Sequence, residues 1–100
     1  MNAEKLKNHL KANCLGRGKT VSGPSLEHTL HISGNELRRQ VNRLRRESVP
    51  IASSRDGYFY AANAGEVYAT IRQLRRMEQG LAAAIQGLER ALERVGGDVP

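Results

Sequence analysis

The chain has 100 residues, of which 39% are hydrophobic, and its formal net charge is +6. This length permits one modest hydrophobic core and argues against a large buried active site. The single cysteine, Cys14, excludes an internal disulfide, and no apolar run reaches the length of a membrane span. Residues 1–63 carry eleven Lys and Arg against five Asp and Glu, whereas residues 64–100 carry five of each. This asymmetry indicates that the first part of the chain meets a polyanion.

Leucines spaced by four residues predict two short helices near the start of the chain. Leu6 and Leu10 indicate a helix over residues 3–13, and Leu26 and Leu30 indicate a second helix of about two turns. The sequence Ser-Gly-Pro just before the second helix supplies an N-cap and a proline suited to a first helical turn. The Lys-Thr-Val stretch between the two helices favours a short strand.

The segment CLGRGKT, residues 14–20, ends like a nucleotide-binding phosphate loop. Such a loop needs a glycine five positions before its Gly-Lys pair, a strand before it and a helix after it. Asn13 stands at the glycine position, the preceding residues have a helical pattern, and Pro24 follows closely. We therefore predict that no nucleotide binds here, and that a glycine turn exposes Arg17 and Lys19.

A third helix is predicted over residues 34–47. Ser33 and Glu36 form the Ser-x-x-Glu pattern of a capping box, in which each side chain accepts a hydrogen bond from the other residue's backbone N–H. The apolar residues of this helix recur on one face, at Leu37, Val41 and Leu44. Its remaining sides are polar and basic, with Asn35, Arg38, Arg39, Asn42, Arg43, Arg45 and Arg46.

Two β-prone runs, residues 49–53 and 57–61, flank an Asp-Gly pair, which is a strong hairpin signal. Side chains alternate between the two faces of a strand. Tyr58 and Tyr60 therefore share one face of the second strand, and we expect that face to lie on the core.

Residues 64–95 have the composition and period of one long helix, and residues 96–100 are expected to be a disordered tail. Apolar residues recur in this helix at alternating steps of four and three, with Glu78 interrupting the series. We expect the first part to pack on the preceding domain and the second part to pack on another copy of the chain. The predicted dimerisation surface consists of Leu81, Ala84, Ile85, Leu88 and Leu92. The alternative is that the helix bends back onto its own domain, near Gln79 and Gly80.

The order of these elements predicts a mainly α fold with a small β-hairpin, in the α+β class. Residues 26–44, LEHTLHISGNELRRQVNRL, resemble the core of the winged helix-turn-helix superfamily, and residues 49–61 resemble the wing of its biotin-ligase-repressor type. The resemblance covers residues 3–63 and extends to small phage-like winged-helix proteins with a helical tail. Two positions depart from the family pattern: His31 replaces a usual glycine and Glu27 a usual alanine. The positions that match are Leu26, Leu30, Ile32, Ser33, Leu37, Val41 and Leu44.

The resemblance implies a winged helix-turn-helix domain over residues 1–63, which binds double-stranded DNA, followed by a C-terminal helix over residues 64–95. The first half of the second helix of such a motif faces base edges in the major groove, and later residues meet the backbone. The candidate base-reading residues are Asn35, Arg38, Arg39 and Asn42. The candidate DNA-backbone contacts are Lys19, Arg43, Arg45, Arg46, Ser54 and Arg55.

This interpretation predicts a cytoplasmic, nucleoid-associated protein that is not an enzyme and uses no cofactor or metal. Cys14 and the histidines lack the spacing of a metal site. The expected partners are double-stranded DNA and a second copy of the chain, as in a small bacterial or phage transcriptional regulator. Two alternatives stay open: a replication or packaging accessory that binds DNA to seat a larger complex, and a protein-interaction adaptor.

Overall fold

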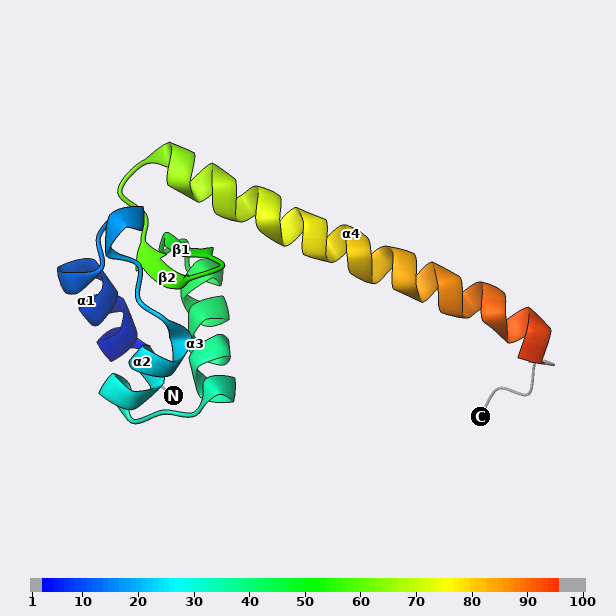
Figure 1. The fold of residues 1–100 in the computed structure, drawn as a ribbon, viewed down its shortest axis with the longest axis horizontal. Helices are drawn as coiled ribbons and strands as arrows, with labels where there is room; N and C mark the ends of the chain where they lie inside the picture. Colours follow the sequence, from blue (N-terminus) through cyan, green and yellow to red (C-terminus); the bar gives the residue numbers. More distant parts are fainter. Residues whose placement is uncertain (1–2, 96–100) are drawn as a thin grey trace. The chain divides into compact units, whose positions relative to one another are not determined.

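The computed structural model describes residues 3–95, so the predicted disordered tail lies outside the described residues (Figure 1). The described chain is mainly helical, with one small antiparallel sheet and a long C-terminal helix, which confirms the expected α+β class. It divides into two compact units, one ending at Thr70 and the other beginning at Ile71. This division falls inside the C-terminal helix, a little after the expected boundary at residue 63.

The N-terminal unit contains the three predicted helices, α1 (Glu4–Asn13), α2 (Gly23–Leu30) and α3 (Gly34–Arg46). The side chain of Ser22 caps α2 by accepting a backbone N–H of its first turn at 3.2 Å. At the other end of α2, His31 adopts the left-handed conformation with φ of 56°. The position that usually takes glycine is therefore occupied by a residue that tolerates positive φ at some cost.

Of the two hydrogen bonds of the predicted capping box at the N-terminus of α3, the structure shows the one accepted by Ser33. The Ser33 hydroxyl accepts the backbone N–H of Glu36 at 3.1 Å. The Glu36 carboxylate does not complete the capping box, because it accepts from Gln40 Nε2 at 3.0 Å and pairs with Arg39 at 3.5 Å. The helix is thus capped by Ser33 alone, and Glu36 belongs to the side-chain network of the exposed face.

The predicted hairpin consists of β1 (Ile51–Ser54) and β2 (Gly57–Tyr60), paired antiparallel around a two-residue turn. The expectation that the face with Tyr58 and Tyr60 lies on the core is met only in part, because both side chains pack against the core without being enclosed by it. The core-facing residue of β2 is Phe59, which is 2% exposed, whereas both tyrosines are half-buried at the edge of the core. Alternation places the fully apolar ring inside and leaves the tyrosines at the rim, where their hydroxyls can reach water.

The chain between α1 and α2 runs along β2 without forming the predicted strand. It contains one 3₁₀ turn, η1 (Arg17–Lys19), and only isolated bridges to β2. Val21 exchanges both backbone hydrogen bonds with Tyr58, at 2.9 and 2.8 Å. The predicted strand is therefore reduced to the single bridged residue Val21, and the other bridge, at Leu15, lies before η1.

The core of the N-terminal unit gathers the apolar faces of its three helices and the inner face of the hairpin. Glu27, one of the two residues that depart from the pattern resembled by the sequence, is half-buried. Its carboxylate lies 3.4 Å from the point where a Cβ of Gly34 would stand, beside the first turn of α3. An acidic group beside the first turn of a helix is favourable. The largest completely buried side chains are Leu6, Leu10, Leu26, Leu37 and Val41.

The C-terminal helix α4 (Ala64–Val95) is continuous and includes Gln79 and Gly80. Thr70 fastens its beginning to the hairpin, because Thr70 Oγ1 accepts the N–H of Ser53 at 3.2 Å and donates to the carbonyl of Glu66 at 3.2 Å. Beyond Ile71 the large apolar side chains are exposed. Among the described residues, no helix combines the length and the apolar character needed to cross a membrane.

Candidate nucleic-acid interface

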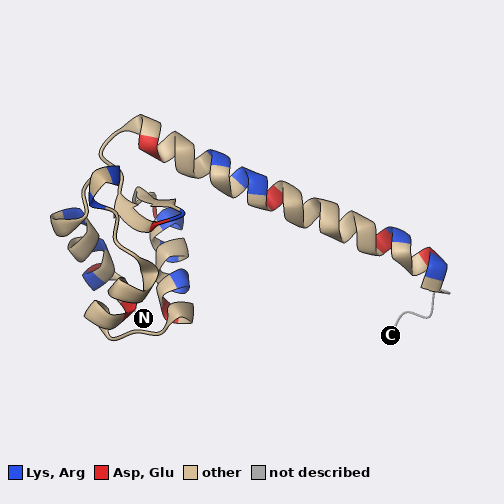
Figure 2. Ribbon diagram, viewed as in Figure 1, with Lys and Arg blue, Asp and Glu red and all other residues tan. Residues whose placement is uncertain are grey.

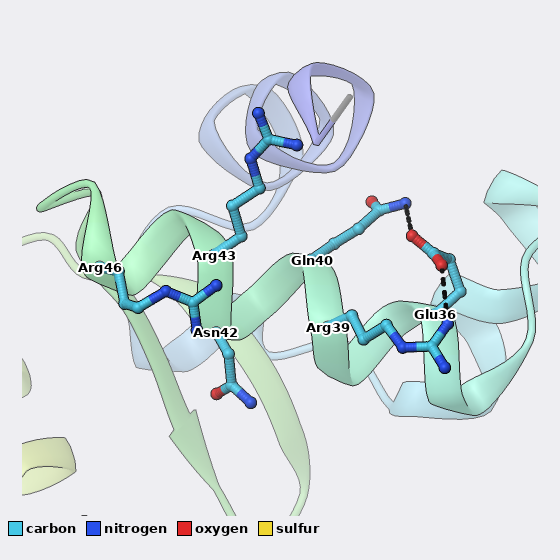
Figure 3. A pocket seen from close by; sticks show the side chains of 6 residues that line it. All are labelled: Glu36, Arg39, Gln40, Asn42, Arg43 and Arg46. Carbon is cyan, nitrogen blue, oxygen red and sulfur yellow. Dashed lines mark hydrogen bonds and ion pairs between the residues drawn. The ribbon is translucent and has the colours of Figure 1, made fainter. Parts of the chain in front are cut away.

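The outer side of α3 carries the densest group of arginines in the N-terminal unit (Figure 2). An open depression of about 460 Å³ lies over it, and Figure 3 shows the side chains that surround this depression. The opposite side of the helix is buried in the core. The lining residues are Glu36, Arg39, Gln40, Asn42, Arg43 and Arg46.

All four candidate base-reading residues are exposed on α3. Arg39, with 76% of its side chain exposed, and Asn42 line the depression. Arg38 donates from Nη2 to Asn35 Oδ1 on the first turn of the helix, and neither of these two residues lines the depression. Two of the four candidates, Arg39 and Asn42, thus line the depression, and the other two lie beside it on the same helix.

The three arginines of α3 that were expected to contact the DNA backbone separate into two groups. Arg43 and Arg46 are exposed and line the depression, and Arg43 Nε pairs with Glu47 at 3.2 Å. Arg45 is instead directed to the hairpin.

Arg45 links α3 to β1 through two hydrogen bonds. Its Nε donates to the carbonyl of Ile51 at 2.9 Å and its Nη2 donates to the hydroxyl of Ser53 at 3.1 Å. Burial lowers the pKa of the Arg45 guanidinium, and the nearby Tyr58 opposes this shift. With two donors committed to the hairpin, Arg45 has a structural task, and we withdraw it from the candidate phosphate contacts.

The remaining candidate backbone contacts lie outside α3. Arg55 is exposed in the hairpin turn, next to the exposed Asp56. The hydroxyl of Ser54 accepts the backbone N–H of Asp56 at 3.3 Å and so helps to shape the turn. Lys19 is exposed on η1, which lies beside β2 (Figure 1), and it does not line the α3 depression.

The Gly-Arg-Gly-Lys turn does not have the surroundings of a phosphate loop, since α1 precedes it, its last three residues form the 3₁₀ turn η1, and α2 begins only at Gly23. Gly16 adopts φ of 87°, and the next N–H, that of Arg17, is bound by the Glu66 carboxylate at 2.9 Å. The other oxygen of Glu66 accepts the N–H of Ala62 at 2.7 Å. The Arg17 N–H, which a phosphate would accept in a phosphate loop, is therefore bound by a carboxylate of the same chain.

The pKa of Glu66 is lowered, first by the N–H of Ala62 and then by that of Arg17. The unfolded carboxyl has a pKa of about 4.3. A folded pKa below that value means that the ionised group stabilises the fold above pH of about 4.3, and that this contribution is lost as the pH falls through the folded pKa. We expect Glu66→Gln to reduce the acid sensitivity of unfolding, which thermal melts between about pH 3 and 6 would measure. An unchanged pH dependence would contradict this role of Glu66.

The sequence analysis did not predict the side-chain hydrogen bonds that three polar residues make around α3 and the Gly-Arg-Gly-Lys turn. Glu66 is one of them, and the pattern Asn-x-x-Glu at residues 63–66 is a helix-start signal that could have revealed it, because Asn63 Oδ1 accepts the N–H of Glu66. Glu36 and the buried Gln40 are the others. Their spacing of four residues, with Arg39 between them, is typical of interacting side chains on a helix.

Comparisons of the chain with protein-family models, with curated proteins and with solved structures gave no match. Within residues 3–95, no group of three or more His, Cys, Asp or Glu side chains is arranged to hold a metal ion.

Proposed function

We propose that this chain is a DNA-binding protein of the winged helix-turn-helix class, which inserts α3 into the major groove of double-stranded DNA. The observation that carries the proposal is the two-sided character of α3. Its apolar side is buried in the core, whereas the side chains of Arg38, Arg39, Arg43 and Arg46 are exposed. A helix fits the major groove, and exposed arginines match both guanine edges and phosphates.

The position of each side chain along α3 suggests its contact. Arg39 and Asn42, with Asn35 and Arg38, are the base-reading candidates, because Arg pairs with guanine and Asn with adenine. Glu36 holds Arg39 at 3.5 Å and favours one orientation of its guanidinium. Phosphates are contacted by residues later in α3 and in the hairpin, which acts as the wing. The proposed backbone contacts are Arg43, Arg46, Ser54, Arg55 and Lys19.

We also propose that the protein is a homodimer. The predicted dimerisation surface on α4 includes Leu81, Ile85 and Leu88, which are 67%, 58% and 70% exposed in the single chain. Contiguous apolar surface of this kind marks an interaction site. A cytoplasmic, nucleoid-associated transcriptional regulator of bacterial or phage type, without enzymatic activity, combines these two properties.

DNA binding is tested by titrating a fluorescent duplex of random sequence with the protein at several salt concentrations. The logarithm of the binding constant is expected to fall with the logarithm of salt by about 0.9 for each phosphate contact. The exposed cations of α3 and the hairpin predict a steep slope. A flat response would contradict the proposal and would favour an adaptor that binds another protein.

The division between base and backbone contacts is tested with two single variants. Arg39→Ala is expected to weaken binding to a preferred site by about 1–3 kcal/mol and to relax the preference at one base pair. Arg46→Ala is expected to weaken preferred and random duplexes alike. Selection of bound sites from random duplexes, followed by affinity measurements, gives both values. Identical effects of the two variants on both kinds of DNA would show that the division is wrong.

A further inference from the structure

The large apolar residues of segment 71–95 recur as a heptad seam with one charged member. In heptad notation the a positions are Ile71, Glu78, Ile85 and Leu92, and the d positions are Leu74, Leu81, Leu88 and Val95. The seam residues from Leu74 onwards, apart from Glu78, are among the exposed large apolar side chains of the chain. A seam of this kind fits one partner above others: a helix with the same repeat.

Charged residues lie in two groups along this segment, of which the second contains both acidic and basic residues (Figure 2). Arg72 and Arg75 precede the centre, whereas Glu89 and Glu93 follow it, on the same side of the helix. Arg75 and Glu89 both occupy the e position, four residues after a seam isoleucine. Charges at e and g positions set the orientation of paired helices. Neither residue has an ion-pair partner within the described part of the chain.

A parallel pair in register does not use this pattern. It would place Glu78 against Glu78 of the second copy at an a position, and like charges in the seam are unfavourable. It would also place each Glu89 beside Ala84 of the second copy, so the arginines and glutamates would not meet. The charges therefore favour the antiparallel orientation.

We infer that residues 71–95 pair antiparallel with the same segment of a second copy, and that the two-fold axis crosses the seam at the level of Ala83, which itself occupies an outward f position. This inference rests on the proposed homodimer and specifies its orientation and register. Each seam residue then opposes the one equally far on the other side of Ala83. The resulting pairs are Ile71 with Val95, Leu74 with Leu92, Glu78 with Leu88, and Leu81 with Ile85.

In this register Arg75 faces Glu89 of the second copy, and Arg72 lies level with Glu93 of the second copy. Each pair occurs twice because the dimer is symmetric. Ala82 and Ala84 meet their own counterparts on either side of the axis, where small side chains allow the helices to approach closely. Glu78 is the one charged residue in the apolar seam, which is unfavourable. Arg75 lies three residues before Glu78 and, in this register, is placed between the carboxylate of Glu78 and that of Glu89 of the second copy.

The test is a charge-reversal cycle on the full chain, measured by sedimentation equilibrium. Arg75→Glu and Glu89→Arg alone are each expected to raise the dimer dissociation constant about tenfold, since each variant places like charges together twice. The double variant R75E/E89R restores the pairing and is expected to return to within about threefold of the unmodified chain. Arg76→Glu, an equal charge change at an outward f position, is the control and should have little effect.

The outcomes separate the inference from the proposals beneath it. If the double variant dissociates as readily as the two single effects combined, the register is wrong while the homodimer stands. If the unmodified chain is a monomer at high micromolar concentration, the register and the homodimer both fail. Neither result bears on DNA binding, which the salt titration tests independently.

Discussion

Replacing Gly57 by alanine is expected to destabilise the N-terminal unit by about 2–4 kcal/mol. Gly57 opens β2 with φ of 141°, in the region that glycine alone adopts readily. A Cβ at this position would stand 2.0 Å from the carbonyl oxygen of Val21 and 2.7 Å from its carbonyl carbon. That oxygen accepts the N–H of Tyr58 at 2.8 Å, so it cannot retreat without breaking the bridge to β2.

The measurement is chemical unfolding followed by tyrosine fluorescence, since the chain has three tyrosines and no tryptophan. Gly18→Ala is the matched control, because a Cβ at Gly18 would meet no atom within 4 Å. We expect the control to change stability by less than about 0.5 kcal/mol. An unfolding midpoint of Gly57→Ala equal to that of the control would show that β2 does not lie against Val21 in this way.

The helices could be predicted because their signals are local. Leucine spacing, the Ser22 and Ser33 caps and the position of His31 each depend on residues within one or two turns of the chain. The face of the hairpin could not be predicted in the same way. Both Phe59 and its tyrosine neighbours suit a strand, and only packing against the helices decides which ring is enclosed.

The sequence could predict which face of α3 carries the arginines, but not the contacts that each arginine makes with other elements. A sequence shows that Arg43, Arg45 and Arg46 lie at the end of one helix, but it does not show where the hairpin lies beside them. Arg45 differs from the other two because its partners, Ile51 and Ser53, are on β1. The bond between Arg17 and Glu66 joins residues 49 positions apart, and no local pattern predicts such a contact.

Reversing two charges on α3, in the double variant R39E/R46E, is expected to reduce affinity for duplex DNA by about 10²- to 10⁴-fold. Both side chains are exposed and line the same depression. Each is proposed to make a hydrogen bond from a charged donor, and such bonds contribute about 1.5–3 kcal/mol. Loss of a phosphate contact by Arg46 should also make the salt dependence less steep, by about 0.9 in slope.

The matched control is R90E/R94E, which changes the net charge equally at positions outside the α3 depression and outside the proposed seam of residues 71–95. Fluorescence anisotropy with one labelled duplex at a fixed salt concentration compares the two double variants directly. We expect the control to lose less than about tenfold, because screening limits the effect of distant charges. Equal losses in both variants would mean that affinity follows net charge instead of the arginine face of α3. Undiminished binding by R39E/R46E, with its fold confirmed by circular dichroism, would remove α3 from the interface altogether.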